Sequence, residues 1–130
     1  MKNNLDERRK YLRLDTVNKI EVYLDRKFIR ISKATVSAFT KNISVEGVCF
    51  FSEKPFPNGK RVRLEIYLPG EETPLHIRGQ IRWVSAVKNK DKKVYEVGVK
   101  LFTVEENDAT RFISYVSSCM AARLGRYLHL

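Results

Sequence analysis

The sequence predicts a mainly β protein, a small antiparallel barrel of six or seven strands followed by one C-terminal α-helix. Between residues 19 and 101, apolar and polar residues alternate over several short segments, a period of two that is typical of half-buried strands. Beyond residue 103 the apolar residues recur at helical spacing. The 130 residues are enough for one domain with a core of its own.

The first predicted strands lie between residues 19 and 51. Apolar positions alternate with polar ones over residues 19–24 and again over residues 36–40, which lead to an Asn-x-Ser-x-x-Gly motif at residues 42–47. The apolar segment Val48–Phe51 follows this motif. We expect the motif to lie at the junction of two β segments.

Three further strands are predicted in the second half of the barrel. Residues 61–68 alternate clearly and end at Pro69-Gly70, a pair that breaks a strand. Residues 76–83 form the next alternating set, and residues 95–101 the last. The polar residues 88–93 between these two sets are predicted to form a solvated hairpin loop.

The change of period after the last strand predicts the helix. Thr103 and Glu106 fit a capping box, in which Thr103 is the N-cap and Glu106 reaches back to it. The apolar face of this helix is formed by residues three, four or seven apart: Ala109, Phe112, Ile113, Val116 and Met120.

Composition favours an anionic partner without identifying it. Twenty-five basic and fifteen acidic residues give a net charge of +10, which suits a nucleotide, a nucleic acid or a membrane surface, and also serves general solubility. The sequence shows no secretory signal and no apolar run long enough to span a bilayer, so a cytoplasmic protein is expected. Cys49 and Cys119 lack metal-site spacing and are predicted to be reduced and buried.

Near the N-terminus, Arg9 and Arg13 form an Arg-x-x-x-Arg motif, preceded directly by Arg8. Arginine forks bind phosphate and the Hoogsteen edge of guanine in a bidentate way. Two arginines four residues apart can hold a ligand with two phosphates on a helix or in an extended segment, so the spacing leaves the conformation open. The alternative is a solvated basic arm that contacts anionic surfaces nonspecifically.

In the second motif, Asn42 and Ser44 would share one face of a strand and present a carboxamide and a hydroxyl together. Gly47 allows a tight turn or the close approach of a ligand to the backbone. The alternative is an ordinary turn, because Asn, Ser and Gly are common turn residues. The sequon formed by residues 42–44 would matter only on a secretory route.

These two motifs together resemble the signature of the PilZ family, receptors for the bacterial second messenger cyclic di-GMP. The order of strands and helix resembles that family as well, from about Glu7 to the C-terminal helix. The resemblance implies that Arg8, Arg9 and Arg13 contact the phosphates and guanine. It also implies that Asn42 and Ser44 read the guanine edge, and that Gly47 permits close approach.

Trp83 is the only tryptophan. By alternation it falls on the same face as Ile77 and Ile81, which favours core packing, while its place near a strand end leaves stacking on a guanine as an alternative. No catalytic or metal-binding pattern occurs, so neither an enzyme nor a metal site is predicted. The ligand itself is the only small molecule expected.

The function predicted from the sequence is therefore a cytoplasmic cyclic di-GMP receptor. Residues 1–14 are expected to form a flexible basic arm that becomes ordered over the ligand, and residues 15–130 the barrel and helix. The ordered arm would signal to an unidentified protein, which the resemblance places in motility, exopolysaccharide or pilus systems. The alternatives are a ligand-independent PilZ-like adaptor and a basic barrel that binds RNA or single-stranded DNA. Barrels of the latter kind usually carry aromatic side chains along an exposed strand face, whereas most aromatic residues here fall among apolar neighbours.

Overall fold

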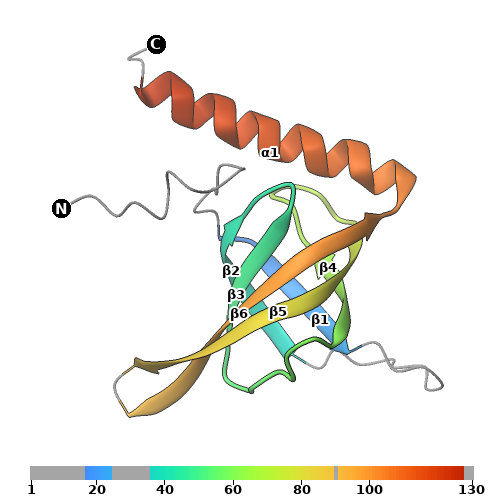
Figure 1. The fold of residues 1–130 in the computed structure, drawn as a ribbon. Helices are drawn as coiled ribbons and strands as arrows, with labels where there is room; N and C mark the ends of the chain where they lie inside the picture. Colours follow the sequence, from blue (N-terminus) through green and yellow to red (C-terminus); the bar gives the residue numbers. More distant parts are fainter. Residues whose placement is uncertain (1–16, 25–35, 90, 128–130) are drawn as a thin grey trace.

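A computed structural model describes residues 17–24, 36–89 and 91–127, which form a closed antiparallel barrel of six strands and one helix (Figure 1). The strands follow the order β1-β2-β3-β6-β5-β4 around the barrel. This confirms the predicted fold class. The elements are β1 (Lys19–Leu24), β2 (Val36–Ile43), β3 (Gly47–Ser52), β4 (Arg61–Ile66), β5 (Leu75–Asn89), β6 (Lys92–Val104) and α1 (Glu106–Tyr127).

The alternating apolar residues point into the barrel and fill it. In β4, for example, Val62, Leu64 and Ile66 are fully buried, whereas the residues between them are half-buried. Phe50 of β3 packs edge to face against Phe56, with ring centroids 5.7 Å apart. Each fully buried large side chain contributes about 1.5–3 kcal/mol. Because the interior is occupied, the outer wall and the ends of the barrel remain for recognition.

The hairpin of β5 and β6 is longer than the sequence predicted. Pairing between the two strands continues to Asn89 and Lys92, so most of the expected loop at residues 88–93 is strand. Neighbouring strands pair with only part of this hairpin, since β4 reaches Gln80 and β3 reaches Tyr95. The rest projects from the barrel as a two-stranded ribbon (Figure 1).

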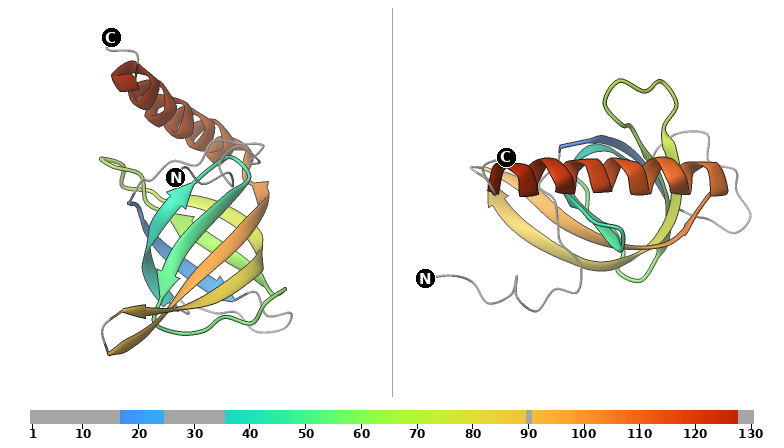
Figure 2. Two further views of the ribbon diagram at one scale, coloured as in Figure 1. Left: turned by 60° about the vertical axis from the view of Figure 1, so that its left-hand side comes forward. Right: turned by 90° about the horizontal axis from the view of Figure 1, so that it is seen from above.

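Helix α1 lies across one end of the barrel (Figure 2). Phe112 and Val116 are buried against the core, as their spacing predicted, but Ile113 is 55% exposed. The predicted cap at Thr103 is wrong. Thr103 still belongs to β6, where it pairs with Arg78, and the helix begins at Glu106.

Polar contacts fix the helix to the strands beneath it. Asp108 accepts a hydrogen bond from the backbone N–H of His76 through Oδ2 at 2.9 Å. The Tyr115 hydroxyl lies 3.1 Å from Nδ2 and 3.3 Å from Oδ1 of Asn18, the residue before β1. Asn18 is buried. The helix is therefore tied to the point where the chain enters the barrel.

Candidate functional site

The structure describes four of the seven predicted site residues. Arg8, Arg9 and Arg13, with the whole arm at residues 1–14, lie outside the described residues. Asn42 is the penultimate residue of β2, and Ser44 and Gly47 border the turn to β3. Trp83 belongs to β5.

Ser44 is buried and its hydroxyl closes the turn between β2 and β3. Its Oγ accepts hydrogen bonds from the backbone N–H groups of Gly47 at 3.1 Å and Glu46 at 3.3 Å. It lies 3.4 Å from the carbonyl oxygen of Gly47, to which it donates. Because β2 ends at Ile43, strand geometry does not place Ser44 on one face with Asn42. The turn-forming role is thus present in the structure.

Gly47 is required by the approach of a neighbouring strand. A Cβ built at this position would lie 2.8 Å from the carbonyl oxygen of Val99 in β6. Real Cβ atoms do not come so near to a backbone oxygen, so a larger residue would push β6 away. The close approach predicted for Gly47 is made here by the protein's own backbone.

One cross-strand row brings Asn42 and Trp83 onto the same wall of the barrel. Asn42 of β2 pairs with Cys49 of β3, Cys49 with Gly98 of β6, and Gly98 with Trp83 of β5. Val97 and Val99, on either side of Gly98, are buried in the core. The row therefore faces outward and spans three strand spacings, about 14 Å.

The prediction that Trp83 shares the inward face of Ile77 and Ile81 is wrong. The register of β5 shifts between Ile81 and Trp83, so Arg82 is an extra, bulged residue that reverses the alternation. The half-buried indole consequently lies on the outer wall against Gly98. A Cβ on Gly98 would be 2.1 Å from Nε1 and 2.2 Å from Cε2 of Trp83.

Neither Gly98 nor the position of Cys49 was predicted from the sequence. A glycine inside a strand often marks the close approach of another group, and this signal is present at Gly98. Cys49 is buried, as predicted, whereas Cys119, which was also predicted to be buried, is half-buried. Nothing in the sequence indicated that Cys49 lies between Asn42 and Gly98 in the outward row.

The chain enters the barrel close to this row. The backbone N–H of Asn18 donates to Oγ1 of Thr40 at 2.8 Å, and its carbonyl accepts from the N–H of Thr40 at 2.9 Å. Thr40 precedes Asn42 by two residues on β2, at most about 7 Å along the strand, and the register against β3 shifts between them. The connection from the N-terminal arm is thereby anchored beside Asn42.

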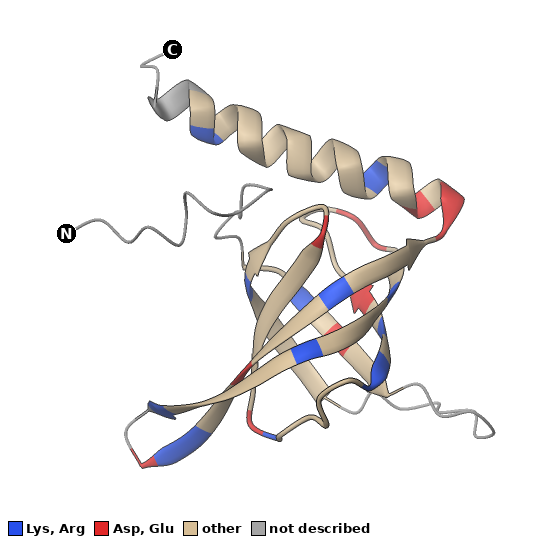
Figure 3. Cartoon of the chain, viewed as in Figure 1, with Lys and Arg blue, Asp and Glu red and all other residues tan. Residues whose placement is uncertain are grey.

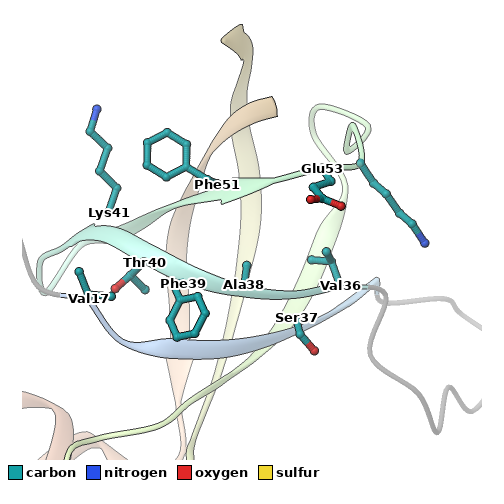
Figure 4. A pocket seen from close by; sticks show the side chains of 10 residues that line it. Val17, Val36, Ser37, Ala38, Phe39, Thr40, Lys41, Phe51 and Glu53 are labelled. Atoms are coloured by element: carbon teal, nitrogen blue, oxygen red, sulfur yellow. The ribbon is translucent and has the colours of Figure 1, made fainter. Parts of the chain in front are cut away.

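An open groove of about 730 Å³ runs along β2 as far as Lys41, the residue before Asn42 (Figure 4). Phe39 and Phe51 line it and are 59% and 40% exposed. Lys41, next to Asn42, lies over the Phe51 ring at 5.8 Å and forms an ion pair with Glu96. The groove thus combines aromatic surface with a lysine.

Within residues 17–24, 36–89 and 91–127, no group of three His, Cys, Asp or Glu side chains is placed to hold a metal ion. None of the helical sequence in these ranges is both long and apolar enough to cross a bilayer.

Solved structures with the same fold have low sequence identity to this chain. The Bacillus subtilis inhibitor of motility MotI/DgrA has a TM-score of 0.66 and 20% identity over 91% of the chain. The PilZ domain of Escherichia coli YcgR with cyclic di-GMP has a TM-score of 0.66 and 14% identity over 95%. For Borreliella burgdorferi PlzA in complex with cyclic di-GMP, the values are 0.57 and 13% over 95%.

The chain spans 52% of the Bacillus protein and 55% of the Borreliella protein, but 99% of the YcgR domain. Comparison with curated proteins finds no match. The PilZ domain model matches residues 7–118, which include both sequence motifs, all six strands and the first half of α1. The chain belongs to the PilZ domain family.

Proposed function

We propose that this protein is a cytoplasmic receptor for cyclic di-GMP, which binds on the outer wall formed by β2, β3, β6 and β5. The observation that carries the proposal is the outward row that joins Asn42 to Trp83 across four strands. Membership of the PilZ family supports it, as do the structures of the YcgR PilZ domain with cyclic di-GMP and of PlzA in complex with cyclic di-GMP.

The two ends of the row offer complementary chemistry for a guanine nucleotide. The Asn42 carboxamide both donates and accepts hydrogen bonds, and can therefore read a guanine edge. The half-buried indole of Trp83 supplies an aromatic face for stacking, worth about 1–3 kcal/mol per base. Ser44 fixes the turn that follows Asn42, and we assign it the further role of contacting guanine.

Chain length allows the arginines to reach this row. Arg13 precedes Asn18 by five residues and Arg9 by nine. An extended chain spans about 3.3–3.6 Å per residue, so Arg13 has a reach of roughly 17 Å from Asn18. Since Asn18 is hydrogen-bonded to Thr40 beside Asn42, both arginines can meet phosphates held at the row. Arg8 adds a third guanidinium next to them.

Signalling would follow from ordering of the arm over the bound ligand. The four cations Arg8, Arg9, Lys10 and Arg13 repel one another, and ligand phosphates remove this repulsion. The ligand would then join arm and barrel into a new surface for a protein partner. In the alternative, a ligand-independent adaptor, the same wall would bind its partner directly.

Isothermal titration calorimetry tests the proposal, with cyclic di-GMP compared against GMP, GTP and cyclic di-AMP. We expect selective binding of cyclic di-GMP and a loss of roughly tenfold or more in Asn42→Ala, because one hydrogen-bonding group to the ligand is removed. Asn58→Ala, in the exposed loop before β4, is the matched control and should bind normally. Absence of heat at saturating cyclic di-GMP would refute the receptor and favour the adaptor.

A further inference from the structure

A basic surface lies on the same barrel and shares no residue with the row from Asn42 to Trp83. Five cationic residues of β4, β5 and β6 are exposed or half-buried and alternate with residues of the core. Lys and Arg positions on these strands are blue in Figure 3. We call this set the basic strip. Its members are Arg61, Arg63, Arg78, Arg82 and Lys100.

The strand register brings the strip together. Arg61 pairs with Gln80, which pairs with Lys100 on its other side. In the adjacent row, Arg63 pairs directly with Arg78. Paired residues lie about 5 Å apart and successive outward rows about 7 Å apart, so these cations share one compact area of the wall.

The strip lacks internal charge compensation. No salt bridge joins any of its five cations to an acidic group among residues 17–24, 36–89 and 91–127. Two acidic side chains at the ends of this wall are engaged by other partners. Glu65 accepts from the Tyr23 hydroxyl at 2.9 Å and faces His76, and Glu96 pairs with Lys41.

The arrangement of the arginines is unfavourable for the isolated barrel. Like charges directly opposite each other on a sheet destabilise it, and Arg63 faces Arg78 in this way. Arg63 is partly compensated by the Tyr23 ring, 4.4 Å from its guanidinium carbon, but Arg78 is exposed and has no such contact in the described part of the chain. An external anion would remove the repulsion.

We infer that the basic strip is a docking surface for an acidic segment of a partner protein. A closed barrel offers no free strand edge at this wall, so recognition depends on side chains, and carboxylates are the protein groups that match arginine forks. The inference does not depend on cyclic di-GMP, because no residue of the strip belongs to the row from Asn42 to Trp83.

Features that favour nucleic acid are weak at the strip. Single-stranded nucleic acids use a basic groove lined by several stacking rings. Among the described residues, Phe102 is the strongly exposed aromatic residue at the strip. Arg82 already lies over its ring, with the guanidinium carbon 6.0 Å from the ring centroid. Nucleic acid is accordingly the rival ligand that the test must distinguish from an acidic peptide.

Fluorescence anisotropy with a labelled peptide of alternating glutamate and alanine tests the inference at physiological salt. Arg61→Glu/Arg78→Glu should weaken peptide binding roughly tenfold or more, because both exposed arginines change sign. Arg61→Gln/Arg78→Gln should give a smaller loss of peptide affinity. This neutral variant keeps the test valid if the charge-reversed variant does not fold. Lys92→Glu/Lys93→Glu, at the exposed tip of the hairpin, makes the same change in net charge and should have little effect.

Three results would overturn the inference. Equal losses in the strip and hairpin variants would show diffuse attraction to net charge. Tighter binding of oligouridine than of the peptide, with the same dependence on Arg61 and Arg78, would assign the strip to nucleic acid. Preferential binding to phosphatidylserine vesicles would assign it to a membrane surface. All strip variants should retain their affinity for cyclic di-GMP, which separates failure here from failure of the proposed receptor.

Discussion

The contact between Gly98 and Trp83 offers a direct test of the outward row. In Gly98→Ala the new Cβ would start 2.1 Å from Nε1 of Trp83. Ordinary heavy-atom contacts are about 3.5–4 Å, so the indole must retreat by roughly 1.5 Å or rotate away. If the ring stacks on a guanine, its displacement should cost most of one stacking interaction, about 1–3 kcal/mol. Cyclic di-GMP affinity should fall roughly 5- to 150-fold.

The intrinsic fluorescence of the protein makes this prediction easy to measure. Trp83 is the only tryptophan, so the emission spectrum reports on this one indole. Gly98→Ala should change the emission of the free protein and reduce the quenching caused by cyclic di-GMP. Calorimetry then gives the change in affinity, and urea unfolding checks that the barrel remains folded.

Two further variants isolate the cause. If alanine at 98 acts only through the indole, then Gly98→Ala should have little additional effect in a Trp83→Ala background. Gly79→Ala is the contrasting control, because its Cβ would lie 2.6 Å from the carbonyl oxygen of Lys100 and from Cγ1 of the core residue Val99. It should lower stability. Wild-type emission and affinity in Gly98→Ala, or fully additive losses in the double variant, would refute the stacking role of Trp83.

Three other predictions concern the turn, the arm and the alkaline limit of stability. Ser44→Ala should lower the free energy of unfolding by about 1–3 kcal/mol in urea titration, because the N–H of Gly47 loses its hydrogen-bond acceptor. Ser44→Thr keeps a hydroxyl and should retain most of the wild-type stability. Arg13→Ala should weaken cyclic di-GMP binding by about 1.5–3 kcal/mol in calorimetry with an unchanged melting temperature, and a large loss of stability without ligand would show that Arg13 is structural. Burial and the hydrogen bond to Glu65 raise the pKa of the Tyr23 hydroxyl above its ordinary value of 10.0. The stabilising effect of the protonated hydroxyl is therefore complete below pH 10 and is lost as the pH rises through the raised pKa. The difference in unfolding free energy between wild type and Tyr23→Phe should therefore shrink above pH 10, and a difference independent of pH would contradict this.

The fold was predictable because hydrophobic alternation is dictated by burial. A strand that closes the barrel has one face against the core, so its apolar residues recur with a period of two wherever its register is regular, as in β4. The end of the last strand was not predictable in the same way. Thr103 and Glu106 satisfy a capping pattern, yet pairing of Thr103 with Arg78 holds it in β6. Local sequence does not reveal which long-range pairing prevails.

The candidate site was predictable only in part. Asn42, Ser44 and Gly47 were identified as a motif, and a turn was one of the roles left open for it, because the bonds that Ser44 makes to Glu46 and Gly47 are local. The packing of Gly47 against the backbone of Val99 became visible only in the structure, since Val99 is far from Gly47 in sequence. Spacing within a motif cannot separate such packing from contact with a ligand.

The bulge at Arg82 explains both the misassigned tryptophan and the position of the proposed site. The barrel interior is filled by side chains such as Phe50 and Ile81, so a ligand can be recognised only from outside or at the ends. A regular strand would have carried position 83 inward with Ile81, and the row from Asn42 would then have lacked an aromatic ring. One inserted residue moves the indole to the wall, and Gly98 leaves room for it there. Periodicity assumes a uniform register and therefore fails where the proposed binding surface is built.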